Sequence, residues 1–374
     1  MVSPEVRVRL LKAADRLVGT SLVNLLSLMP RKKGHSDRGI RKVLFIRPGG
    51  IGDAVLLLPA VKALRHHIKG VSVDVLCEKR NAGVFDLSDD IGSVYLYDSG
   101  GGLLKCLRNT YDIVFDTEQW HRLSAVVALL ARAPETVGFH TNERSRLFTR
   151  KVAYSHDEYE VESFLRLVEA SVGKPIEFDP DKAFLRAPAS RVSGALSGQG
   201  ELVALFPGAS VRERHWGSEK YGTVARALQH KGCRVIIVGS HQDAEEAAVI
   251  RQRAPEVIDL SGQTSLSDAA AVLQACRLLV TADSGLMHIA AAVGTPTVSL
   301  FGAGIQKKWA PRGRSHVILN KGLPCSPCTR FGYTPRCPRG VGCLSLISPD
   351  EVVEVAEKVM GRTDVYDERK RGEF

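Results

Sequence analysis

Residues 43–55 read VLFIRPGGIGDAV, which is an apolar run, a glycine-rich turn and the start of a long apolar-periodic segment at 53–68. This order is typical of a β-strand that turns directly into an α-helix. Turns of this kind usually leave room for a phosphate, but this one ends on the carboxylate of Asp53, which repels phosphate. The turn alone explains Asp53 equally well as a functional acid or as the N-cap of a helix over 54–68.

The rest of the chain repeats this alternation of short apolar runs and amphipathic segments. The alternation indicates parallel sheets with helices on both faces, so the predicted fold class is α/β, with two Rossmann-like, doubly wound domains facing a central cleft. The predicted strands are 43–47, 71–77, 93–98, 111–116, 202–207, 234–239, 256–260, 278–282 and 296–301. The predicted helices are 53–68, 101–109, 120–132, 158–172, 218–231, 242–253, 266–276, 285–293 and 349–360.

Composition suggests where the domains divide. A chain of 374 residues is long enough for two domains, and its 44% hydrophobic and 25% charged residues are typical of a soluble globular protein. Between the halves, residues 187–200 read APASRVSGALSGQG, which indicates a linker. We predict an N-terminal arm at 1–40, a first domain at 41–186, a linker at 187–201 and a second domain at 202–374.

The N-terminal arm concentrates the basic charge. Residues 1–47 carry eleven Lys or Arg against three acids, a net charge of +8 out of +10 for the whole chain, and the arm has apolar residues at helical spacing. It is too short to span a bilayer and lacks the pattern of a secretory signal, so we expect a cytoplasmic protein. A basic amphipathic helix favours an anionic membrane surface, whereas the alternative is a helix docked on the protein's own core. No nucleic-acid motif accompanies the charge, so nucleic acid is not an expected partner.

The most specific pattern of the second half is TADSGLMHIAAAVGTPTVSLFG, residues 281–302. A strand leads into Asp283, Ser284 and Gly285, and a helix begins near Leu286, so free N–H groups and the helix dipole favour an anion such as a diphosphate. Ser284 can add a hydroxyl donor, and His288 lies one turn into the helix. The alternative is a plain N-cap at Asp283 or Ser284 with a buried core histidine.

A second turn suited to phosphate, LFPGASVRERHW (205–216), follows the strand 202–207. Its Ser210, Arg212 and Arg214 offer a hydroxyl and two guanidinium groups. Taken alone, this turn is equally well explained as a solvated basic loop. Two such turns in one domain favour phosphate binding.

Four cysteines, Cys325, Cys328, Cys337 and Cys343, fall within nineteen residues. Their number and the leading Cys-x2-Cys suit a structural zinc, with an iron–sulfur cluster as the other option. The spacing matches no standard zinc ribbon because a second Cys-x2-Cys is missing. Free thiols and disulfides remain alternatives.

Three segments together resemble a known family. RPGGIGDAVLLLPAVKALR (47–65), LFPGASVRERHWGSEKY (205–221) and DSGLMHIAAAVGTPTVSLFG (283–302) have the order and spacing of the ADP-heptose:lipopolysaccharide heptosyltransferases, glycosyltransferase family 9. YDIVFDTEQ (111–119) and ETVGF (135–139) also look like that family, so the resemblance covers roughly residues 41–360. It implies a GT-B fold and an inverting, metal-independent transfer of heptose from ADP-heptose to the lipid A-linked inner core of lipopolysaccharide.

The resemblance also assigns roles by position. It places the catalytic base at Asp53, and an acid suits this turn because an acceptor hydroxyl must lose its proton as it attacks the anomeric carbon. Arg214 stands where family members have a Lys, and Ala209 replaces a frequent hydroxyl. Either Asp243 or Glu245 fits the acid that binds the adenosine ribose. The remaining donor contacts are Ser210, Arg214, Asp283, Ser284, Gly285, Leu286 and His288, and the predicted acceptor contacts are Gly50, Gly52 and Glu118.

The resulting prediction is a heptosyltransferase without a cofactor for catalysis, peripheral on the inner face of the inner membrane. One alternative is the same machinery with another nucleotide sugar or acceptor, such as an O-antigen or other glycan. A second alternative is a non-catalytic, membrane-associated, metal-binding protein. We also expect deletion of residues 1–38 to abolish binding to anionic vesicles while sparing transfer to a soluble acceptor analogue.

Overall fold

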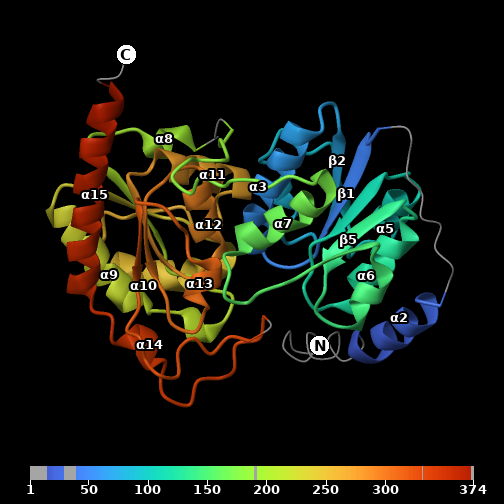
Figure 1. Cartoon of the computed structure of the whole chain (residues 1–374). Coiled ribbons are helices and arrows are strands. Elements are labelled where there is room, and N and C mark those ends of the chain that lie inside the picture. The colour runs from blue at the N-terminus through green and yellow to red at the C-terminus, as the bar shows by residue number, and fades with distance from the viewer. Residues whose placement is uncertain (1–14, 29–38, 189–191, 331, 372–374) are drawn as a thin grey trace. The chain divides into compact units, whose positions relative to one another are not determined.

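The computed structural model describes residues 15–28, 39–188, 192–330 and 332–371, and the chain divides into two compact units between Phe178 and Asp179 (Figure 1). Residues 179–186, which composition assigned to the first domain, pack within the second unit. The N–H groups of Phe184 and Leu185 each donate to the carbonyl of Ala292 at 2.9 Å. The predicted linker is partly described and contains a short helix, α8 (Ser193–Leu196).

The N-terminal unit is built on one parallel sheet. Its described strands have the order β3-β2-β1-β4-β5-β6, so the direction of the strand order reverses between β1 and β4. Doubly wound sheets bind ligands at such a switch point, outside the carboxyl ends of the strands. The strands are β1 (Lys42–Arg47), β2 (Ser72–Cys77), β3 (Ser93–Leu96), β4 (Ile113–Asp116), β5 (Glu135–Phe139) and β6 (Arg150–Val152). The helices are α3 (Ile51–His67), α4 (Ala82–Phe85), α5 (Gly100–Leu107), α6 (Arg122–Leu130), η2 (Glu143–Leu147) and α7 (Glu160–Val172).

The C-terminal unit repeats this topology with different elements. Its described strands have the order β12-β11-β10-β7-β8-β9, so its switch point lies between β7 and β10. The strands are β7 (Leu202–Phe206), β8 (Arg234–Ile237), β9 (Ile258–Asp259), β10 (Leu278–Ala282), β11 (Thr297–Leu300) and β12 (His316–Leu319). The further helices are η3 (Arg212–Arg214), α9 (Ser218–His230), η4 (His241–Asp243), α10 (Ala244–Arg253), α11 (Leu266–Ala275), α12 (Gly285–Ala292), α13 (Gln306–Trp309), α14 (Gly342–Ser345) and α15 (Pro349–Arg371).

The central strands are buried on both faces, as expected for parallel sheets covered by helices. Val43, Leu44, Phe45 and Ile46 of β1 have no exposed surface, and Phe45 stacks on Phe115 of β4 with ring centroids 4.7 Å apart. Every predicted strand and helix of the two units is present with ends shifted by a few residues, except that α15 continues to Arg371 whereas the prediction ended at residue 360. β5, β6 and β12 were not predicted.

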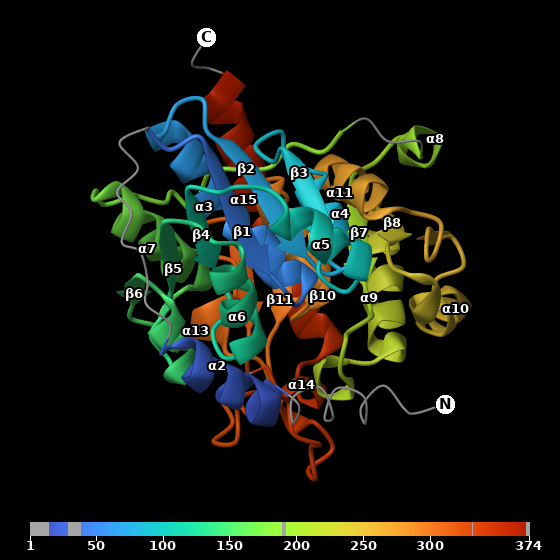
Figure 2. The same ribbon diagram turned by 90° about the vertical axis from the view of Figure 1, so that its right-hand side faces the viewer.

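The described part of the arm is docked on the N-terminal unit. A π-helical turn, η1 (Asp15–Gly19), continues into α2 (Thr20–Leu26), and both contact α6 (Figures 1 and 2). Val23 is fully buried in a core cluster with Ala125 and Leu147, which confirms docking for this stretch. Segments 1–14 and 29–38 of the predicted arm lie outside the described residues.

The docked arm has a second, outward face. Leu17, Leu25 and Leu28 are 71%, 63% and 81% exposed, and Val18 is also exposed. We call these four residues the outer face of the arm. Among the described residues, no helix combines the length and apolar character needed to cross a bilayer.

Candidate functional site

The glycine turn of the N-terminal unit joins β1 to α3 at the carboxyl edge of the sheet. α3 begins at Ile51 after an extended Gly50, so Asp53 lies inside the first turn of the helix. The interpretation of Asp53 as an N-cap is therefore wrong. Its Oδ2 is 4.0 Å from the points that Cβ atoms on Gly49 and Gly50 would occupy, so side chains at these positions would cover the half-buried carboxylate.

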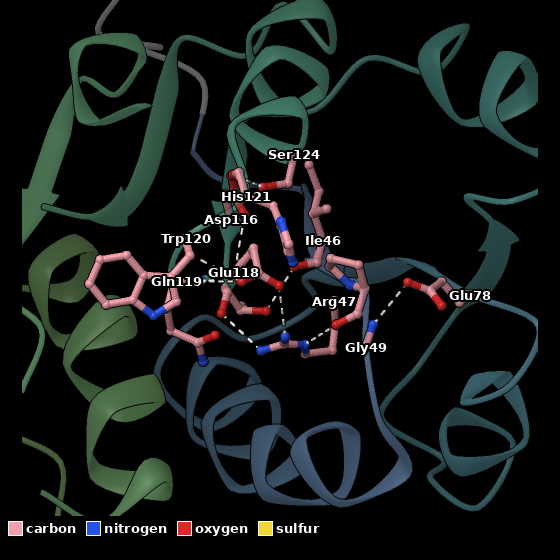
Figure 3. Close-up of polar contacts among 12 residues, drawn as sticks. Ile46, Arg47, Gly49, Glu78, Asp116, Glu118, Gln119, Trp120, His121 and Ser124 are labelled. Atoms are coloured by element: carbon pink, nitrogen blue, oxygen red, sulfur yellow. Dashed lines mark hydrogen bonds and ion pairs between the residues drawn. The ribbon is translucent and has the colours of Figure 1, made fainter. Parts of the chain in front are cut away.

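Arg47 lies beneath this turn and organises it. The side chain is fully buried, and its Nε donates to the carbonyl of Pro48 at 2.7 Å while Nη1 donates to the carbonyl of Thr117 at 2.9 Å. Nη2 is 3.3 Å from Oε2 of Glu118 (Figure 3). Burial lowers the pKa of Arg47, but nearby carboxylates, with Asp53 foremost, outweigh burial and raise it. Arg47 therefore stays charged between the two strands at the switch point.

Glu118 follows β4 and completes this buried pair. Its Oε1 accepts hydrogen bonds from the N–H groups of Gln119 at 2.9 Å and Trp120 at 3.1 Å. Burial raises the pKa of Glu118, but the Arg47 cation and further donors lower it below its ordinary value. The predicted residues Gly50, Gly52, Asp53 and Glu118 thus share one switch point, although Glu118 is directed at Arg47.

Arg47 was missed as a functional residue. A basic residue that ends a fully apolar strand directly before Pro-Gly-Gly was the available signal, because a buried cation requires a carboxylate partner.

In the C-terminal unit, the helix that follows β10 begins as the sequence predicts. Ser284 is the N-cap of α12, and its Oγ accepts a hydrogen bond from the N–H of Met287 at 3.3 Å. The capping interpretation of Ser284 is therefore confirmed. Gly285 and Leu286 form the start of the helix, where N–H groups have no partner within the helix itself.

His288 lies one turn further and is almost completely buried. Burial, together with the positive charge of Arg214, lowers its pKa to about 3, so the imidazole is neutral at physiological pH. Within the described chain, its Nδ1 is buried without a hydrogen-bond partner. An unpaired buried nitrogen of this kind is a candidate ligand contact.

Arg214 connects the two phosphate-suited turns. It ends η3, in the loop after β7, and its Nη1 is 3.2 Å from Oδ2 of the buried Asp283. Its Nε is buried and, among the described residues, has no partner. A Cβ on Gly304 would lie 2.0 Å from Oδ2 of Asp283, so only glycine fits beside this pair. Ser210 is exposed in the same loop.

The two acids predicted as alternatives for binding the adenosine ribose have different surroundings in the structure. Oδ2 of Asp243 accepts hydrogen bonds from the N–H and the hydroxyl of Ser240 at 2.7 and 2.8 Å. Oδ1 lies 1.9 Å from the point that a Cβ on Gly208 would occupy, so Asp243 reaches the loop after β7. Glu245 is exposed on the first turn of α10.

The four clustered cysteines pack beside these loops. The N–H of Cys337 donates to Glu213 at 3.1 Å, and the N–H of Cys328 donates to the carbonyl of Ala303 at 3.1 Å. Burial raises the pKa of the Cys343 thiol, and the nearby thiols of Cys328, Cys337 and Cys325 raise it further. All eight cysteines lie among the described residues and are free, so the disulfide alternative is wrong. In the described chain, no three His, Cys, Asp or Glu side chains are grouped as a metal site.

The sequence matches a family of known proteins over most of its length. The model of glycosyltransferase family 9 (heptosyltransferase) matches residues 102–334. Lipopolysaccharide heptosyltransferase 3 of Escherichia coli K12 is 25% identical over 333 residues, which cover 83% of this chain and 95% of that protein.

Solved structures show the same fold. E. coli ADP-heptose lps heptosyltransferase II superimposes with a TM-score of 0.70 at 22% identity, covering 86% of this chain and 99% of that one. E. coli heptosyltransferase WaaC with ADP-2-deoxy-2-fluoro heptose gives a TM-score of 0.66 at 18% identity, covering 85% and 99%. The predicted α/β fold of GT-B type is confirmed.

Proposed function

Because the chain belongs to glycosyltransferase family 9, the heptosyltransferases, we propose that it transfers a heptose from ADP-heptose to the inner core of lipopolysaccharide, with inversion and without a catalytic metal. The chain is a glycosyltransferase, which sets aside the alternative of a non-catalytic binding protein. The observation that supports the proposal is that Asp53 follows a strand at the switch point of the first sheet, and that Arg214 and Ser284 follow the two strands at the switch point of the second.

In the N-terminal unit, Asp53 is the proposed base. Its carboxylate is half-buried above a glycine turn, and Gly50 rather than Asp53 forms the N-cap of α3. Asp53 takes the proton of an acceptor hydroxyl as that oxygen attacks the anomeric carbon. The bond to ADP breaks on the opposite side of the sugar, and ADP leaves with the bonding electrons, which inverts the configuration.

In the C-terminal unit, the proposed diphosphate site consists of Arg214, the start of α12 and His288. Arg214 and the N–H groups at the helix start stabilise the negative charge on the departing ADP. Asp283 has the same sign of charge as the diphosphate, so its proposed role is to hold Arg214 through the 3.2 Å ion pair. Of the two acids proposed for the ribose, Asp243 is favoured because it reaches the loop after β7.

The proposed location is the inner face of the inner membrane. The outer face of the arm presents Leu17, Val18, Leu25 and Leu28 to solvent, and residues 1–47 carry a net charge of +8. Exposed apolar side chains within a basic segment suit an anionic lipid surface. The lipid A-linked acceptor lies in such a surface.

A structural zinc or iron–sulfur cluster is proposed at the four clustered cysteines. Their sulfurs are close enough to influence one another's pKa values, and soft thiolates suit either group. The described side chains do not form a ligand set as they stand, so binding requires the segment 325–343 to close around the group. This site is proposed to stabilise the loops that carry Glu213 and Ala303, not to take part in transfer.

The direct test uses lipopolysaccharide from a strain that lacks this protein. Incubation with the purified protein and ADP-heptose should add one heptose to the core, as measured by mass spectrometry, with inverted anomeric configuration by NMR. Turnover only with another nucleotide sugar would favour the alternative donor. Absence of turnover with any nucleotide sugar would contradict the proposal.

A further inference from the structure

The carboxylate of Asp15, in the docked arm, accepts hydrogen bonds from the backbone at the start of α6. One carboxylate oxygen accepts hydrogen bonds from the N–H groups of Arg122 and Leu123, both at 2.9 Å, and the other accepts from Arg122 at 3.1 Å. Within the described chain, the N-cap residue His121 does not cap α6 with its own side chain. Asp15 is therefore the cap of α6, supplied from 107 residues earlier in the chain.

Close packing and further hydrogen bonds hold the arm against the start of α6. A Cβ on Gly19 would lie 2.8 Å from Cβ of Arg122, so glycine lets the arm approach the helix closely. Glu143 accepts hydrogen bonds from Thr20 Oγ1 at 2.8 Å and Arg122 Nε at 2.5 Å. Burial raises the pKa of Asp15, but hydrogen bonds from His121 and from the backbone N–H groups of Leu123 and Arg122 lower it below its ordinary value. Asp15 is thus a charged cap, which suits the positive end of the helix dipole.

The residues directly before α6, 117–121, form a loop that contains Glu118, which the family resemblance assigns to acceptor binding; we call it the acceptor loop. Its far end is held by Glu118, which pairs with Arg47 beside Asp53. Its near end is His121, whose carbonyl accepts a hydrogen bond from Nε of Arg144 at 3.0 Å. The direction in which the loop leaves α6 depends on how the first turn of that helix is held.

We propose that Asp15 is a positioning residue that holds the acceptor loop, so that the docked arm sets the affinity for the acceptor. The proposal rests on the proposed function of the N-terminal unit. Asp15 touches neither reactant and acts through α6. The arm therefore joins an outer face suited to lipid with an inner contact that orders the loop for a lipid-linked acceptor.

The test compares three variants of the full-length protein, with ADP-heptose and lipopolysaccharide from a strain lacking this protein as substrates. Asp15→Ala should raise KM for the acceptor, by about five-fold when the roughly 1 kcal/mol of a typical helix cap is lost from acceptor binding, and leave KM for ADP-heptose unchanged. Asp15→Asn should restore the acceptor KM because its amide oxygen caps nearly as well. Val23→Ala is the control, since it leaves a cavity in the same arm without touching the loop. It should lower Tm and keep the acceptor KM of the wild type.

Hydrogen exchange provides a readout that does not need turnover. The amides of Arg122 and Leu123 should exchange faster in Asp15→Ala than in the wild type or in Asp15→Asn. Faster exchange with an unchanged acceptor KM would overturn the positioning role, and so would an equal rise of KM in Val23→Ala. Lack of turnover in the wild type would instead contradict the proposed function.

Discussion

Nη2 of Arg47 lies 3.3 Å from Oε2 of Glu118, so the ends of β1 and β4 are joined by a buried ion pair at the switch point. Glu118→Gln removes the carboxylate in direct contact with the buried cation, although Asp53 remains nearby. We expect this variant to lose about 3–5 kcal/mol of unfolding free energy, the usual cost of breaking a buried pair. Denaturant unfolding at pH 7 would measure it, and a loss below 1 kcal/mol would contradict it. Leu130→Ser, on the exposed surface of α6, is the control.

The same pair predicts a pH dependence. The pKa of Glu118 is lower in the folded state than its ordinary value of 4.5, so the unfolded chain binds this proton more readily. The stability that Glu118 contributes is therefore present above about pH 4.5 and is lost as pH falls through its folded-state pKa. The difference in stability between wild type and Glu118→Gln should shrink below that pH. A difference that stays constant on acidification would count against the ion pair.

Asp53→Asn should lower kcat by about 10²–10⁴-fold, the usual range for removal of a general base. ADP affinity should not change, because the proposed nucleotide site belongs to the other unit. Stability should fall, not because a cap is lost, since Asp53 is not the N-cap of α3, but because Asp53 is the foremost carboxylate near the buried Arg47 cation. Steady-state kinetics and calorimetry with ADP measure these quantities. A kcat within a few-fold of the wild type would rule out Asp53 as the base.

If Asp283 acts only through Arg214, the effects of substituting the two residues on donor binding should be coupled. Arg214→Met and Asp283→Asn should each weaken ADP binding, by about 1–3 kcal/mol for a charge-assisted contact. The double variant should lose no more than Arg214→Met alone, and calorimetry would reveal this coupling. Additive losses would mean that Asp283 contacts the donor independently.

The outer face of the arm should bind lipid. Leu17→Ser, Leu25→Ser and Leu28→Ser combined should reduce co-sedimentation with anionic vesicles at least about ten-fold, since the apolar contacts are lost. Leu346→Ser removes a side chain that is 60% exposed on the C-terminal unit and serves as the control. Equal vesicle binding by the combined variant and the wild type would remove the membrane role.

The cysteine cluster should bind a structural metal or iron–sulfur cluster. Protein purified without tags or chelators should contain about one zinc ion or iron–sulfur cluster per chain, and Cys328→Ser should lose it and lower Tm. Cys276→Ser alters a buried thiol away from the cluster and should retain the metal. A metal-free wild type of full stability would identify these four cysteines as plain thiols.

The central strands and the helices that follow them could be predicted because their apolar periodicity is complete within each segment. β5, β6 and β12 could not. β6 is only the three residues Arg150–Val152, two of them charged, and β5 (Glu135–Phe139) contains a charged residue and a glycine, so neither has a complete apolar run of its own. An edge position alone does not explain the difference, since the edge strands β3 and β9 were predicted. Such strands owe their conformation to pairing with a neighbour more than to their own side chains. The site loops were predictable for the same reason as the central strands, since each directly follows one.

The features that depend on tertiary contacts could not be predicted from the sequence. Helical spacing marks the arm as amphipathic, but it does not tell that Val23 faces the core while Leu25 faces solvent. The cap that Asp15 provides for α6 has no signature near either residue. Deleting residues 1–38 would remove both Val23 and Asp15, so the structure gives a reason for this deletion to impair transfer. Point substitutions on the outer face replace it as the cleaner experiment.

In the described part of the chain, the two units divide at one point, between Phe178 and Asp179, and each unit carries a sheet with its own switch point. This organisation suits modular exchange between family members. With the acceptor site proposed in the first unit and the donor site in the second, we expect a chimera of residues 1–178 of this chain and the second half of a relative to keep the acceptor preference of one parent and take the sugar-nucleotide preference of the other. Under this proposed assignment, recombination at one position would be enough to create a new pairing of donor and acceptor.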